Sequence, residues 1–287
     1  MTLILDGKIA RDFYKKALVE RVGRLSCVPA LSIIQIGDDK ESSVYIEQKK
    51  KFGLSIGVKV YHIKLSTDVT FDEVADVVKR ENSNREISGI IIQSPVPEHL
   101  DFIKLVNLID PKRDVDGLTD ENQELLAEGK PRFVPATAHG VMLLLDFYKI
   151  PVLGKKVAVV GRSRLVGGPI AKVMGMKGAN VTVCHSKTPN TAEITRQSDI
   201  VIVAVGRPEF INRSYIGEGA VVIDVGINSV YGEYSEKLEE EIPKRKLTGD
   251  VDFSNVFDIV SAITPVPGGV GPMTVLSLFD NLVSPSP

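Results

Sequence analysis

Residues 157–169 combine a chain turn that can approach an anion with side chains that can bind one. Four apolar residues predict a buried strand that ends directly before Gly161, where the chain must turn sharply. Arg162 and Ser163 add a cation and a hydroxyl, and two later glycines and a proline suit the start of a helix. Because a helix N-terminus favours negative charge, the pattern predicts a phosphate site. A tight turn without a ligand is the alternative, and for an isolated glycine turn it is the preferred one.

The strand that follows this turn indicates which dinucleotide would bind. Asn180–Cys184 has the spacing of the second strand of a βαβ unit. An NAD site usually carries Asp or Glu near the end of that strand, where the acid binds the ribose hydroxyls. Here the strand is followed by His185, Ser186, Lys187 and a threonine, with no carboxylate. Hydroxyls and cations suit a 2′-phosphate, so the sequence predicts NADP and not NAD.

Two stretches in the first half could carry out acid–base chemistry. Tyr45 and Lys49 stand four residues apart in a predicted helix and therefore share one face. A solvated lysine-rich face is the alternative, because Lys50 and Lys51 follow directly. Further along, Asp114 and Asp116 flank a valine, which could be a charged linker, a metal loop or a buried ligand-binding carboxylate. The other oxygen ligands of a calcium site are missing, so no metal site is predicted.

Helices and strands alternate along the chain, which predicts parallel sheets covered by helices. In such sheets ligands bind beyond the carboxyl ends of the strands, where Gln93 and the glycine turn both lie. Residues 231–246 are rich in charge and are predicted to be an exposed excursion. The predicted helices are 8–25, 43–52 (capped by Ser42 or Ser43), 71–81, 100–109, 137–148, 170–177 and 274–283, and the predicted strands are 30–36, 59–65, 87–93, 156–160, 180–184, 200–205 and 220–225.

The composition is that of an ordinary soluble enzyme. A length of 287 residues suits two domains, and 43% apolar with 25% charged residues are globular values. A net charge of −2 argues against nucleic-acid and anionic-membrane partners. The two cysteines, Cys27 and Cys184, have no metal-ligand spacing and are predicted to be reduced in a cytoplasmic protein. No signal peptide or membrane-spanning run is predicted.

Taken together and in order, the motifs of the chain resemble those of the bifunctional methylenetetrahydrofolate dehydrogenase/cyclohydrolase family. The likeness covers nearly the whole chain. The chain departs from the family pattern at Ser94, at Ala136 and Ala138, and at Val275-Leu276-Ser277, and none of these departures removes a proposed catalytic group. The matching motifs are Ser43-Val44-Tyr45-Ile46 with Lys49, Gln93-Ser94-Pro95-Val96-Pro97, residues 112–117, Gly161-Arg162-Ser163, Cys184-His185-Ser186, residues 225–228, residues 249–253 and residues 264–274.

The resemblance implies two α/β domains with a cleft between them, the second a Rossmann-type NADP-binding domain. The final helix of the family returns to the first domain. The implied boundaries are 1–118 plus 265–287 for the folate-binding and catalytic domain, and 119–264 for the NADP-binding domain. The family is usually a homodimer, so a homodimer that binds tetrahydrofolate derivatives is expected.

The resemblance also implies roles for single residues. Lys49 is similar to the catalytic lysine of the family, Gln93 to the glutamine that positions it, and Asp116 to the carboxylate that hydrogen-bonds the pterin and belongs to the catalytic set. Tyr45 is similar to the aromatic residue that stacks on the folate. Further implied folate contacts are Pro265, Gly268 and Gly269, and the implied NADP contacts are Gly161, Arg162, Ser163, Ser186 and Ile227.

The implied activity is oxidation of 5,10-methylenetetrahydrofolate by NADP⁺ to the 5,10-methenyl compound, followed by its hydrolysis to 10-formyltetrahydrofolate. The second step needs proton transfer, for which the pKa of Lys49 should be lowered by burial and by the charges of Lys50 and Lys51. A monofunctional dehydrogenase is the main alternative. A silent NADP-binding regulator and a dehydrogenase of a small alicyclic acid are more remote.

Overall fold

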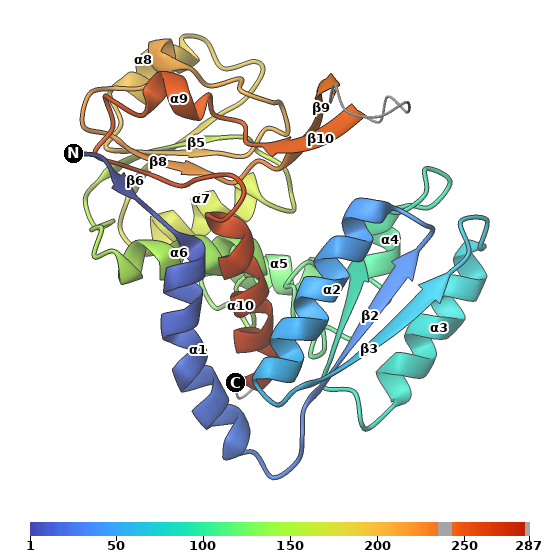
Figure 1. The fold of residues 1–287 in the computed structure, drawn as a ribbon. Helices are drawn as coiled ribbons and strands as arrows, with labels where there is room; N and C mark the ends of the chain where they lie inside the picture. Colours follow the sequence, from blue (N-terminus) through green and yellow to red (C-terminus); the bar gives the residue numbers. More distant parts are fainter. Residues whose placement is uncertain (235–242, 285–287) are drawn as a thin grey trace. The chain divides into compact units, whose positions relative to one another are not determined.

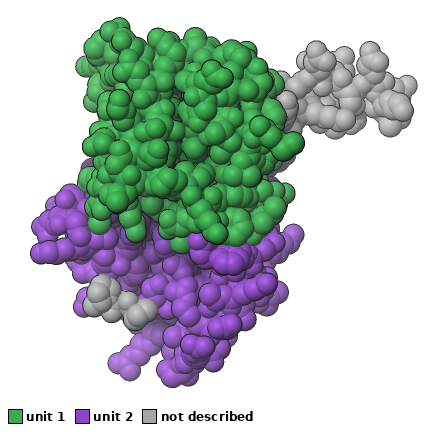
Figure 2. All heavy atoms as spheres, turned by 90° about the vertical axis from the view of Figure 1, so that its left-hand side faces the viewer, with its two compact units in different colours: residues 1–10, 140–273 green, residues 11–139, 274–287 purple. Residues whose placement is uncertain are grey.

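The computed structural model describes residues 1–234 and 243–284, and it divides into two compact units. Unit 1 comprises residues 1–10 and 140–273, and unit 2 comprises residues 11–139 and the C-terminal segment from 274. Figure 2 colours unit 1 green and unit 2 purple. Three helices have residues in both units, namely α1 (Gly7–Gly23), α6 (Ala136–Phe147) and α10 (Val270–Val283). Each unit is described by itself below.

Unit 2 is built on a parallel three-stranded sheet with the order β3-β2-β4 (Figure 1). The central strand β2 (Ala30–Ile36) is buried along its whole length, as its mostly apolar sequence predicts. It pairs with β3 (Lys59–Leu65) on one side and with β4 (Gly89–Gln93) on the other. Because the chain passes from one edge of β2 to the other, the carboxyl ends of β2 and β4 lie at a switch point, the preferred ligand position in such sheets.

Helices cover this sheet with apolar faces. Helix α3 (Phe71–Ser83) begins with a capping box between Thr70 and Glu73, and its buried Val74 and Val78 pack against β2 and β4. The same core includes residues of α4 (Phe102–Val106). Within unit 2, the ring of Phe279 in α10 lies 5.4 Å from the ring of Phe52 in α2 (Lys40–Ser55). The C-terminal helix is thus part of the core of this unit.

Unit 1 is built on a parallel six-stranded sheet with the order β1-β11-β8-β7-β5-β6 (Figure 1). Strands β5 and β7 are adjacent, and β6 lies on the other side of β5, so a second switch point falls between the carboxyl ends of β5 and β7. The connecting helices are α7 (Gly167–Met176) and α8 (Thr191–Arg196). The strands are β1 (Leu3–Ile4), β5 (Lys156–Val160), β6 (Asn180–Cys184), β7 (Ile200–Val203), β8 (Val221–Asp224) and β11 (Ala262–Ile263).

The longer predicted elements are present, and several short ones were not predicted. Strands β1 and β11 have two residues each, too few for a periodic pattern. Part of the predicted excursion at 231–246 is an antiparallel pair of strands, β9 (Asn228–Tyr234) and β10 (Pro243–Thr248), whereas 235–242 lie outside the described residues. Other elements that were not predicted are α5 (Asp120–Ala127), α9 (Phe253–Val256) and the 3₁₀ turn Arg213–Tyr215.

Candidate active site and nucleotide-binding edge

Helix α2 carries two of the predicted site residues, and its start is held by side chains at the switch point of unit 2. The helix begins at Lys40, and its N-cap is Asp39, whose carboxylate accepts the Ser42 N–H at 2.6 Å. The predicted cap at Ser42 or Ser43 is therefore wrong. Both serines bond elsewhere: Ser42 Oγ donates to the Ser94 carbonyl at 3.2 Å, and Ser43 Oγ donates to the Asp39 carbonyl at 3.0 Å.

Lys49 and Gln93 are in direct contact. Lys49 Nζ donates to Gln93 Oε1 at 2.7 Å, and Gln93 Nε2 donates to the Ser94 carbonyl at 2.7 Å. This pattern determines the orientation of the amide, because the opposite orientation would turn its NH₂ group toward the lysine amine and its oxygen toward a carbonyl. A helix residue and a strand-end residue that are 44 positions apart thus form one hydrogen-bonded pair.

The electrostatics of this pair depend on Asp116. Burial lowers the pKa of Lys49, while the charge of Asp116 opposes that shift. Burial also raises the pKa of Asp116 to about 6, against the attraction of Lys49 and with a smaller contribution from Asp114. Burial lowers the pKa of Lys49 as expected, but the charges of Lys50 and Lys51 are not among the causes of the shift, and Lys50 is paired with Glu47 at 2.7 Å.

The two aspartates of the 111–118 stretch have different surroundings. Asp114 is 1% exposed, and its Oδ2 accepts the Thr119 N–H at 2.7 Å and Asn122 Nδ2 at 2.9 Å. It therefore holds the start of α5. Asp116 is partly buried and interacts electrostatically with Lys49. The sequence predicted a buried ligand-binding carboxylate at one of the two positions, and the structure leaves Asp116 as the candidate.

The predicted folate residues fall in both units. Tyr45 is partly buried in α2, one turn before Lys49, and so lies in unit 2 with Gln93 and Asp116. Pro265, Gly268 and Gly269 lie in unit 1, and their loop closes on itself through a bond from the Gly269 N–H to the Pro265 carbonyl at 2.8 Å.

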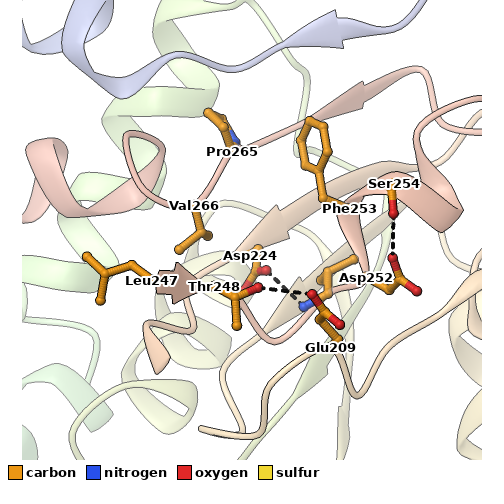
Figure 3. Close-up of a pocket in the computed structure, with 11 residues that line it drawn as sticks. Glu209, Asp224, Leu247, Thr248, Asp252, Phe253, Ser254, Pro265 and Val266 are labelled. Atoms are coloured by element: carbon orange, nitrogen blue, oxygen red, sulfur yellow. Dashed lines mark hydrogen bonds between the residues drawn. The ribbon is translucent and has the colours of Figure 1, made fainter. Parts of the chain in front are cut away.

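A pocket of about 310 Å³ opens beside this loop in unit 1. Figure 3 shows Pro265 and Val266 on one side of it and Glu209 with Thr248 on another. Pro265 is the only predicted site residue among those that line the pocket in the described part of the chain.

The glycine turn after β5 needs its glycines. Gly161 has φ of +126°, and a Cβ placed there would lie 2.1 Å from the Ala204 carbonyl oxygen, at the switch point between β5 and β7. A Cβ at Gly167 would lie 2.2 Å from the Gly161 carbonyl oxygen. These close approaches explain why only glycine is compatible with the turn.

The N–H groups at the start of α7 are bonded within the loop. Ser163 Oγ accepts the N–H groups of Val166 at 3.2 Å and Gly167 at 3.3 Å, and the Ser163 carbonyl accepts the Gly168 N–H at 2.9 Å. These N–H groups are therefore bonded to Ser163 and not free to bind a phosphate in this structure. The helix dipole and the exposed Arg162 side chain are the features that favour an anion here.

The remaining predicted nucleotide residues also lie at the carboxyl edge of the unit 1 sheet. Val160 pairs with Cys184, so Arg162 and Ser186 follow the ends of adjacent strands, and both are exposed. Ile227 follows β8 and is 42% exposed. Cations and hydroxyls without a carboxylate at residues 185–188 fit a 2′-phosphate, so the residues present are compatible with NADP.

Comparison with known proteins decides the family. Residues 5–116 match the catalytic domain of tetrahydrofolate dehydrogenase/cyclohydrolase, and residues 135–286 match the NAD(P)-binding domain of the same enzyme. The chain belongs to the tetrahydrofolate dehydrogenase/cyclohydrolase family.

Relatives within this family are similar over nearly their whole length. The bifunctional protein FolD of Acholeplasma laidlawii is 42% identical over 280 residues, covering 98% of this chain and 96% of the relative. The FolD crystal structure from Campylobacter jejuni superposes with a TM-score of 0.89 at 36% identity, covering 99% and 98% of the two chains. The Trypanosoma brucei enzyme, which was solved with NADP cofactor and an inhibitor, has a TM-score of 0.90 at 36% identity, covering 98% and 96%.

The sequence did not indicate every group in the dehydrogenase/cyclohydrolase site. The Ser94 carbonyl, which orients Gln93 and accepts a bond from Ser42, is a main-chain group with no signature in the residue pattern. No helix within the described ranges is both long and apolar enough to cross a bilayer. Among the same residues, no group of three or more His, Cys, Asp or Glu side chains is arranged to hold a metal ion.

Proposed function

We propose that this protein oxidises 5,10-methylenetetrahydrofolate to 5,10-methenyltetrahydrofolate with NADP⁺ and then hydrolyses that product to 10-formyltetrahydrofolate. The observation that carries the proposal is the contact of Lys49 Nζ with Gln93 Oε1 at 2.7 Å, in a chain that is 42% identical to a bifunctional FolD protein. Family membership does not by itself show that this chain contains a lysine with a lowered pKa. A partly buried amine with a lowered pKa is suited to proton transfer near neutral pH.

NADP⁺ accepts the hydride in the first step. Gly161, Arg162, Ser163, Ser186 and Ile227 are the residues proposed to hold it. Arg162 and Ser186 would bind the 2′-phosphate, because they lie at adjacent strand ends where no carboxylate competes. Hydride transfer depends on holding the two reactants in line, so the contribution of the protein to this step is positioning.

Lys49 is proposed to move protons in the second step. Water adds to the methenyl carbon, and its oxygen gives up both protons over the course of the hydrolysis. N5 takes one proton as its bond to that carbon breaks, and the other leaves to solvent. The lowered pKa of Lys49 gives it a larger neutral fraction near pH 7 than a free lysine has, so it can accept the first proton. Gln93 keeps the amine in place without adding a charge, whereas a carboxylate would raise the pKa of the amine.

Asp116 and Tyr45 are proposed to bind the folate. Asp116 is partly buried and would accept hydrogen bonds from pterin N–H groups, and Tyr45 offers a ring on the helix that carries Lys49. Pro265, Gly268 and Gly269 are proposed as further folate contacts. The division into a folate-binding domain of 1–118 plus 265–287 and an NADP-binding domain of 119–264 remains a prediction, as does a cytoplasmic homodimer.

One assay separates the bifunctional enzyme from a monofunctional dehydrogenase. Purified protein is mixed with 5,10-methylenetetrahydrofolate and NADP⁺, and the absorbances of NADPH and of the methenyl product are followed together. In a second cuvette, methenyl substrate alone is followed against its spontaneous hydrolysis. We expect NADPH formation in the first and accelerated hydrolysis in the second. Hydrolysis at the spontaneous rate would leave only the dehydrogenase, and absence of NADPH would overturn the proposal.

A further inference from the structure

Asp250 is a fully buried carboxylate that the proposed chemistry does not use. It is 0% exposed, and its two oxygens accept four hydrogen bonds. Oδ2 accepts the N–H groups of Val205 at 2.6 Å and Gly206 at 2.9 Å, and Oδ1 accepts the Arg207 N–H and Asn228 Nδ2, both at 2.8 Å. One side chain thus bonds the loop after β7 and the loop after β8.

A second buried carboxylate, Asp224, holds the same region from the end of β8. Its Oδ1 accepts the N–H groups of Gly226 at 2.9 Å and Asp250 at 3.0 Å, and its Oδ2 accepts the Val251 N–H at 2.9 Å. Figure 3 shows Asp224 among the residues that line the pocket. Burial raises the pKa of Asp224 to about 7, with a smaller contribution from the charge of Asp250 and against the hydrogen bonds from main-chain N–H groups.

The main chain leaves room for these carboxylates only at glycines. A Cβ at Gly226 would lie 2.2 Å from Asp250 Cγ, and a Cβ at Gly249 would lie 1.8 Å from Asp224 Oδ2. Two glycines and two buried acids therefore depend on one another. Burying charge costs free energy unless the oxygens are bonded, and the four hydrogen bonds to Asp250 and the three to Asp224 offset that cost.

As a result, the exposed apolar residue Ile227 lies between two residues that are hydrogen-bonded to the buried carboxylates. Ile227 is 42% exposed, while the Gly226 N–H is bonded to Asp224 and the Asn228 amide to Asp250. The loop 205–207 starts one residue after Ala204, whose carbonyl oxygen lies against Gly161. Successive main-chain N–H groups such as those of 205–207 form a common anion-binding arrangement, and here the anion is a side chain of the protein itself.

We propose that Asp250 is a positioning residue that orders loops 205–207 and 226–228 before the nucleotide binds, and so sets the affinity for NADP⁺. The inference rests on the proposed function, because it takes the carboxyl edge of the unit 1 sheet as the NADP site. Ordering a loop in advance increases affinity, because less conformational entropy is lost on binding.

The test is Asp250→Asn, with Asp252→Asn as the matched control. The amide retains the shape of Asp250 but turns one NH₂ group toward main-chain donors. Asp252 lies two residues away and caps α9, a position that asparagine fills equally well. We expect Asp250→Asn to weaken NADP⁺ binding at least tenfold by direct titration and to raise the KM for NADP⁺. The KM for the folate substrate and kcat at saturating NADP⁺ should stay within twofold of wild type, and Asp252→Asn should match wild type throughout. Unchanged NADP⁺ affinity in folded Asp250→Asn would overturn the inference.

A milder variant covers the case in which Asp250→Asn does not fold. Asn228→Ala removes one of the four donors and keeps the carboxylate. We expect weaker NADP⁺ binding and faster amide hydrogen exchange at 226–228 in the protein without nucleotide. Exchange and affinity equal to wild type would contradict the inference. If the wild-type protein itself fails to bind NADP⁺, the proposed function is wrong. That outcome can be told apart from a failure of the inference, in which the wild type binds NADP⁺ and the variants bind it equally well.

Discussion

Lys49 Nζ and Gln93 Oε1 lie 2.7 Å apart, and the amide is held in that orientation by its second bond, to the Ser94 carbonyl. The direct partner of the lysine in this contact is a neutral amide, whereas Asp116 acts on the lysine through its charge. Burial therefore determines the direction of the pKa shift.

Replacing Lys49 by methionine removes the amine and keeps most of the apolar stem. General acid–base catalysis is typically worth ~10²–10⁴-fold in rate, so hydrolysis of the methenyl substrate should fall by about that factor. Hydride transfer needs no proton from the lysine and should persist in part. The measurement is hydrolysis corrected for the spontaneous rate, with Lys51→Met, at an exposed position of the same helix, as control. Near-normal hydrolysis by folded Lys49→Met would remove the residue from the mechanism.

Replacing Gln93 by glutamate places a negative charge next to the lysine amine. An adjacent anion favours the ammonium form, so the pKa of Lys49 should rise, and each unit of the rise reduces the neutral fraction at pH 7 by about tenfold. The pH profile of hydrolysis should then move to higher pH, and Gln93→Met should lower the rate without that displacement. A profile that stays at the wild-type pH in Gln93→Glu would argue against proton transfer through Lys49.

Asp116 should titrate near pH 6, and removal of the Lys49 charge should raise its pKa. Its pKa is raised from 3.8 to about 6 in the folded protein, so the folded state binds the proton more tightly than the unfolded state. The contribution of Asp116 to stability is therefore fully present below pH 4 and is lost as the pH rises through 6. Carboxyl carbon NMR should show this titration, and Lys49→Met should move it upward because an attractive charge is removed. A downward shift would contradict the assigned pairing.

Replacing Arg162 by alanine should discriminate between the two dinucleotides. A hydrogen bond to a charged group is typically worth about 1.5–3 kcal/mol, so NADP⁺ affinity should fall roughly 10- to 100-fold. NAD⁺ lacks the 2′-phosphate, and its affinity should change much less. Titration of both nucleotides checks this, with Lys172→Ala on the exposed surface of α7 as control. Equal losses for NADP⁺ and NAD⁺ would show that Arg162 does not contact the 2′-phosphate.

Much of the fold was predictable because its central strands, such as β2, β5 and β7, are buried on both faces. A strand such as β2, in which every residue is buried, is mostly apolar, with Ser32 and Gln35 as its polar residues, and its end is visible as the first glycine and aspartates after Ile36. The turn at Gly161 was predictable for a related reason, since φ of +126° and a carbonyl in contact exclude any side chain. Two-residue strands such as β1 and β11 carry no periodicity, so only their pairing in the sheet reveals them.

The sequence by itself determined which residue types could act: a lysine one turn after a tyrosine, paired aspartates, and a strand end without an acid. Only the tertiary structure decided their environments, because pKa depends on burial and on neighbours that are distant in the chain. Burial and not Lys50 or Lys51 lowers the pKa of Lys49, and Asp114 is bonded to the start of α5 while Asp116 is not. The surroundings of Asp250 were likewise decided by the tertiary structure. Its four hydrogen-bond donors come from loops that meet only when parallel strands pair side by side.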